Sequence, residues 1–87
     1  MSIIETDLSN AIKLGNGWMI RHFPNAPEYI QIQAVRAGHR VIRYIKNPSI
    51  AVQLEAVRNN TKAIRFIRNP HPDVVAFVTK PQTVLNS

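Results

Sequence analysis

The sequence predicts an all-α domain, built as a small α-solenoid-like stack of three to four short helical hairpins. The first observation behind this fold class is a block of 22 residues that recurs along the chain. The second is that apolar positions within each block step by three and four residues, which is the period of helices and not of strands. The length of 87 residues leaves room for one domain spanning 1–87.

The composition narrows the class of protein. With 45% apolar and 18% charged residues, the chain is too hydrophobic to stay disordered, and the absence of cysteine excludes disulfides and thiolate metal sites. No apolar run reaches the ~18 residues that span a bilayer, and the first residues lack the pattern of a signal peptide. We therefore expect a cytoplasmic protein that does not bind membranes.

The repeat is clearest in two pairs of segments. Segment 34–36 (Ala-Val-Arg) recurs 22 residues later at 56–58, and segment 42–48 (Ile-Arg-Tyr-Ile-Lys-Asn-Pro) recurs at 64–70 (Ile-Arg-Phe-Ile-Arg-Asn-Pro). Such spacing is typical of stacked helical units that bury their apolar faces against one another. The units run over about 4–25, 26–47 and 48–69, with a partial fourth unit at 70–87.

The first helix of the third unit is expected over about 49–58. Segment 47–49 (Asn-Pro-Ser) precedes it, where Asn or Ser can cap free N–H groups and proline suits the first turn. At the corresponding helix end of the preceding unit, Gly38 is expected to adopt a left-handed conformation. This helix is apolar on two sides, with Ile50, Leu54 and Val57 on one side and Val52 and Ala56 on the other. A helix that is apolar on two sides is expected to be buried between neighbouring helices.

The second helix of the same unit is expected over about 62–68. Thr61 can cap its start, and it ends before Pro70 because proline disfavours helical geometry in the preceding residue. Its apolar face comprises Ala63, Ile64, Phe66 and Ile67, and its opposite face comprises Lys62, Arg65 and Arg68. Segment 73–79 is compatible with either a helix or an extended cap.

These motifs resemble short helical repeats of unassigned function in bacteriophage and bacterial proteins. The resemblance rests on the Asn-Pro-Ser segment, the Ala-Val-Arg block and the Ile-Arg-aromatic-Ile-basic-Asn-Pro segment, and it covers about 10–80. It implies an α-solenoid-like stack of phage origin that would act in the host cytoplasm. It implies no catalytic residues. The extra residue within 14–18 and the truncated last unit depart from the pattern.

Positive charge collects on the second helices. The chain carries 11 Lys and Arg against 5 Asp and Glu, for a net charge of +6, and no acid falls within 18–24, 40–46 or 62–68. An amphipathic helix needs a polar face in any case, but like-charged rows repel each other and a polyanion would remove that repulsion. We expect a non-enzymatic binding module that binds nucleic acid without sequence preference, or an acidic protein surface. The expected contacts are Arg21, Arg40, Arg43, Lys46, Lys62, Arg65 and Arg68.

Trp18 leaves two interpretations open. An exposed ring would stack on a base or anchor a protein interface, whereas a buried ring would close the N-terminal end of the core. Tyr44 and Phe66 are expected to belong to the core and not to a stacking platform. The alternative function is a phage-type adaptor or inhibitor that binds a host protein through the basic face and Trp18. Self-association as a homo-oligomer through the end units is a third hypothesis.

Catalytic and metal-binding chemistry is not expected. The three histidines, His22, His39 and His71, fall at different places in their units without a second ligand at metal-binding spacing. Glu5 and Asp7 are close in sequence, but they lie near the chain start, where a role in helix entry is expected for Asp7 or Ser9. The sequence thus predicts neither an enzyme nor a cofactor site.

Overall fold

In the computed structural model, which describes residues 5–23 and 25–79, α-helices alternate with 3-10 helices and no strand occurs among these residues. The predicted all-helical class is therefore confirmed. Segment 73–79, for which two conformations were open, is helical. The elements are, in order, α1 (Glu5–Lys13), η1 (Gly17–His22), α2 (Glu28–Ala37), η2 (His39–Tyr44), α3 (Ile50–Asn59), η3 (Thr61–Phe66) and α4 (Pro72–Thr79).

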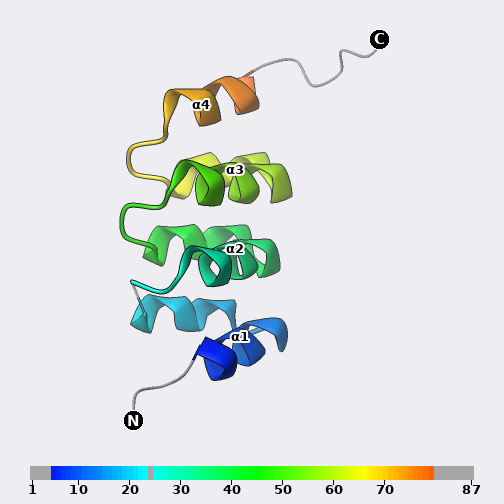
Figure 1. The fold of residues 1–87 in the computed structure, drawn as a ribbon. Coiled ribbons are helices and arrows are strands. Elements are labelled where there is room, and N and C mark those ends of the chain that lie inside the picture. The colour runs from blue at the N-terminus through cyan, green and yellow to red at the C-terminus, as the bar shows by residue number, and fades with distance from the viewer. Residues whose placement is uncertain (1–4, 24, 80–87) are drawn as a thin grey trace.

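The helices are arranged one above another, with α1 and α4 at opposite ends (Figure 1). Each α-helix packs against the next α-helix, and η1 contacts η2 as η2 contacts η3. The resulting body is elongated, with principal extents of 52 × 24 × 16 Å. The three 3-10 helices therefore form a continuous layer beside the α-helices.

The core runs between these two layers. Ile20 and Ile42 reach it from η1 and η2, and Val35, Val52 and Val57 reach it from α2 and α3. The predicted apolar face of α3 is only partly correct, because Ile50 is 42% exposed. Since α3 contacts α2, α4, η2 and η3, its remaining side faces solvent, and Ile50 lies there.

The start of α3 follows the expected capping rule. The Ser49 Oγ accepts a hydrogen bond from the Val52 N–H at 3.2 Å. Ser49 is thus the N-cap, and Pro48 precedes the cap instead of occupying the first helical turn. The Ser49 hydroxyl also donates to Glu28 in α2, which links the starts of the two neighbouring helices.

The second helical segments differ from the prediction in type and in end point. Each is a 3-10 helix of six residues, and η3 ends at Phe66, earlier than the predicted helix. Its cap is Asn60, whose side-chain oxygen accepts from the Lys62 N–H at 2.9 Å, and not Thr61. The chain leaves the helix through the extended and buried Ile67. A 3-10 helix has three residues per turn, so side chains three apart lie directly above one another.

Gly38 does not adopt the predicted left-handed conformation. Its φ of −166° is extended, and Asn60 at the end of α3 is also extended, with φ −160°. The left-handed region is occupied instead by Gly15 (φ 98°) and Asn47 (φ 52°). The chain therefore passes from α2 and α3 into the following 3-10 helices through an extended residue, which is why Gly38 and Asn60 can both occupy this place.

Gln53 connects two loops at one edge of the molecule. Its side-chain Nε2 donates to the Pro48 carbonyl at 3.0 Å, and its Oε1 accepts from the His71 N–H at 2.9 Å. These bonds hold the segment that enters α3 next to the segment that enters α4. Among the residues placed by the structure, no helix is long and apolar enough to cross a membrane.

Candidate functional site

Three 3-10 helices place the predicted cations on one layer of the molecule. Because residues three apart eclipse each other in such a helix, Arg40 lies above Arg43 in η2, and Lys62 lies above Arg65 in η3. Lys46 and Arg68 lie two residues beyond the ends of η2 and η3, and Arg21 belongs to η1. All seven predicted contacts are exposed.

A groove of about 900 Å³ lies between η2 and η3. Four of the seven cations line it, namely Arg43, Lys46, Arg65 and Arg68, and its apolar wall is formed by Ile42, Ile45, Phe66 and Ile67. No acidic side chain is among its lining residues. This groove is called the basic groove below.

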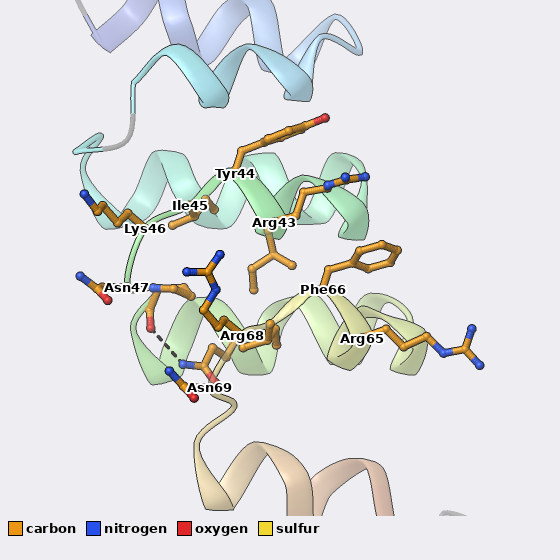
Figure 2. Close-up of a pocket in the computed structure, with 13 residues that line it drawn as sticks. Arg43, Tyr44, Ile45, Lys46, Asn47, Arg65, Phe66, Arg68 and Asn69 are labelled. Carbon is orange, nitrogen blue, oxygen red and sulfur yellow. Dashed lines mark hydrogen bonds between the residues drawn. The ribbon is translucent and has the colours of Figure 1, made fainter.

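The cations are spread along the basic groove. Figure 2 shows Arg43 and Arg65 extending toward the same side of the view, whereas Lys46 lies at the opposite end. Arg68 extends between them, from the end of η3 toward η2. An extended anion could therefore meet positive charge along the whole groove.

Within residues 5–23 and 25–79, none of the seven cations forms an ion pair with a carboxylate. Glu55 binds Arg36 on α2 at 2.8 Å, Glu28 accepts from Ser49, and Asp73 lies 3.8 Å from the His71 ring nitrogen. The acidic groups of these elements are thus directed to the α-helical layer and to the start of α4, away from the basic groove.

Two aromatic rings interleave with the arginines. The guanidinium carbon of Arg21 lies 5.7 Å from the centroid of the Tyr44 ring, and that of Arg43 lies 5.6 Å from the same centroid. Arg43 also lies 5.9 Å from the centroid of Phe66. These distances are within the range of cation–π attraction. The resulting series, called the arginine–aromatic ladder below, joins η1, η2 and η3 and comprises Arg21, Tyr44, Arg43 and Phe66.

The expectation that Tyr44 belongs to the core is wrong, because the residue is 36% exposed. Phe66 is half-buried and packs against the core, as expected. Tyr44 and Phe66 are the last residues of η2 and η3, and the Tyr44 ring reaches Arg21 in η1.

Trp18 is exposed, in agreement with the first of its two interpretations. Its ring is 48% exposed and contacts His22 edge-on, with 6.2 Å between the centroids. It lies at the start of η1 and does not line the basic groove. The neighbouring Gly17 is buried, and a Cβ built on it would lie 3.4 Å from the Ala34 carbonyl oxygen, so η1 is seated tightly against α2.

Sequence reasoning found the cations but missed the aromatic residues between them. A signal was present, since Tyr44 and Phe66 lie 22 residues apart and each directly follows an arginine. Reading that segment as an α-helix placed the rings on the apolar side and concealed their contacts.

The described part of the chain builds no metal site. It contains no group of three or more His, Asp or Glu residues that could hold a metal ion. Pro24, which occupies the place of Lys46 and Arg68 in the first unit, lies outside the described residues. Comparison with known proteins found no matching family model, no matching curated protein and no matching solved structure.

Proposed function

We propose that this protein is a non-enzymatic module that binds nucleic acid through the basic groove, without sequence preference. The observation that carries the proposal is the groove between η2 and η3, which is lined by four cations that form no ion pair with the described residues and by no described acidic residue. We interpret the alternation of α- and 3-10 helices as an α-solenoid-like repeat. The starts of α2, α3 and α4 at 28, 50 and 72 support that interpretation.

Phosphate groups suit this arrangement for electrostatic reasons. Exposed cations that lie within about a Debye length of one another repel each other. A bound polyanion relieves this repulsion, because the protein's cations neutralise its phosphates and take the place of the counterions that had condensed on it. Arginine and lysine donate hydrogen bonds to phosphate oxygens without reading the bases, so binding is independent of sequence. Arg21, Arg40 and Lys62, which are exposed on the same layer, would extend the contact beyond the basic groove.

The test reverses charge in the basic groove and compares it with the same reversal elsewhere. The double variant Arg43→Glu/Arg65→Glu changes two groove cations, and the control Lys13→Glu/Arg58→Glu changes two exposed cations outside the groove; both lower the net charge from +6 to +2. We expect the groove variant to lose DNA affinity by at least about tenfold at ~50 mM salt and to reduce the salt slope by ~0.7 to 0.9 per lost contact. The control should lose much less.

Binding is measured by gel shift and fluorescence anisotropy at two salt concentrations, with circular dichroism to confirm that both variants fold. Equal loss in the two variants would show that only net charge matters and would contradict a groove. Failure of the wild-type protein to shift DNA or RNA at ~50 mM salt would contradict nucleic-acid binding altogether.

A protein partner is the second candidate function, and the exposed ring of Trp18 favours it. An exposed tryptophan is the residue type most often found as an anchor of protein interfaces. An adaptor or inhibitor would use the basic face to complement an acidic patch and Trp18 to fill a pocket. Capture of one protein species from host lysate that resists nuclease and is lost in Trp18→Ala would support this function over the first.

A further inference from the structure

Both aromatic rings beside the basic groove are already in contact with cationic or aromatic groups. Tyr44 has the guanidinium groups of Arg21 and Arg43 at 5.7 and 5.6 Å from its centroid. Phe66 has Arg43 at 5.9 Å and the His39 ring at 6.1 Å. A nucleic-acid base that stacked on either ring would compete with these groups for the ring.

The same contacts position the N–H donors of the arginine side chains for binding phosphate. An arginine that rests on an aromatic ring is attracted to the π-system and still carries N–H donors for an anion. The guanidinium groups of Arg21 and Arg43 therefore stay on the outer layer and need less ordering when phosphate binds. Tyr44 acts here as a positioning residue, because it contacts the arginines of two successive 3-10 helices.

Resting on the proposed function, we infer that the basic groove recognises the sugar–phosphate backbone of duplex nucleic acid in preference to a single strand. Proteins that favour single strands obtain much of their affinity by stacking bases on open aromatic faces, whereas both rings of the arginine–aromatic ladder already have arginine or histidine groups beside them. A site that binds nucleic acid through cations, without base stacking, has the higher affinity for the polymer with the higher charge density. Duplex DNA carries one charge per ~1.7 Å of its axis, from both strands together.

Three probes of equal length test this inference by fluorescence anisotropy. They are a duplex of about 20 base pairs, one of its strands, and an abasic strand with the same number of phosphates. We expect the duplex to bind at least about fivefold more tightly than the strand, with a steeper salt dependence. The natural and abasic strands should bind within about twofold of each other, because bases make no contact.

The opposite order of affinities would overturn the inference. A natural strand that binds at least about fivefold more tightly than the abasic strand would show base stacking, and loss of that difference in Trp18→Leu would locate the stacking at Trp18. In both cases nucleic-acid binding itself would stand. Absence of binding to all three probes would refute the proposed function and this inference together.

Variants of Tyr44 test its positioning role separately. Tyr44→Leu removes the ring and should weaken binding of duplex and abasic strand alike by about three- to tenfold, whereas Tyr44→Phe keeps a ring under both arginines and should restore wild-type affinity. A loss confined to the natural single strand would instead identify Tyr44 as a stacking platform and overturn the assignment. The ring-current shift of the Arg21 side-chain protons, which should disappear in Tyr44→Leu and persist in Tyr44→Phe, provides a readout independent of binding.

Discussion

At the scale of single residues, Gln53 shows how a buried polar group can specify the path of the chain. It is 7% exposed, and both atoms of its amide are bonded to backbone groups that lie in different loops. Burial of an amide costs little when its nitrogen and oxygen are both bonded, whereas removal of the amide leaves two part-buried backbone groups without that partner. Gln53 therefore stabilises the alignment of α3 with α4.

Replacing Gln53 by Leu should lower the free energy of unfolding by about 2–3 kcal/mol, since two backbone groups lose their partner. The matched control is Gln31→Leu, whose side chain is half-buried and donates to the Ala26 carbonyl at 2.8 Å. It should cost about 1 kcal/mol. Urea unfolding of the three proteins measures both values. Equal losses in the two variants would contradict the special role of Gln53.

At the scale of elements, the local signals for helix ends decide less than the packing around them. Gly15 closes α1 with a φ of 98°, where an L-residue with a side chain is strained. Gly38 ends α2 in an extended conformation, and a Cβ built on it meets nothing within 4 Å. The two glycines thus have opposite structural requirements although both follow a helix.

Alanine substitutions should separate these two glycines. Gly15→Ala forces a side chain into the left-handed region and should destabilise the protein by about 1 kcal/mol. Gly38→Ala fits the native backbone and reduces the freedom of the unfolded chain, so we expect a gain of about 0.4–1 kcal/mol. Thermal unfolding checks the signs. A loss of stability in Gly38→Ala would contradict the extended conformation of that residue.

At the scale of the whole molecule, the charge distribution is one-sided. Glu28, Glu55 and Asp73 pair or bond at α2, α3 and α4, and the 3-10 layer keeps exposed cations without ion pairs among the described residues. Like charges that face solvent together oppose folding, because the unfolded chain moves them apart. The exposed cations of the 3-10 layer thus repel one another in the free protein, and salt should screen this repulsion.

Raising NaCl from about 20 to about 300 mM should therefore raise the melting temperature, by about 2–4 °C. The exposed Arg36–Glu55 pair acts in the opposite sense, but a surface pair contributes little. The Arg43→Glu/Arg65→Glu variant, which removes the main source of repulsion, should show a weaker dependence in the same scan. A melting temperature that falls with salt in the wild type would show that attraction between charges dominates.

Sequence by itself determined the helical class and the exposure of the seven cations, because the spacing of apolar and charged residues is a local property. It left the cap of α3 open between Asn and Ser, and the structure places it at Ser49. It did not determine that the second segments are 3-10 helices, since apolar steps of three and four residues fit either 3.0 or 3.6 residues per turn. Packing between successive layers decided that, and with it the exposure of Tyr44, the extended Gly38 and the groove between η2 and η3. These features depend on contacts between residues about twenty positions apart. A local sequence pattern carries no information about the free energy of such contacts.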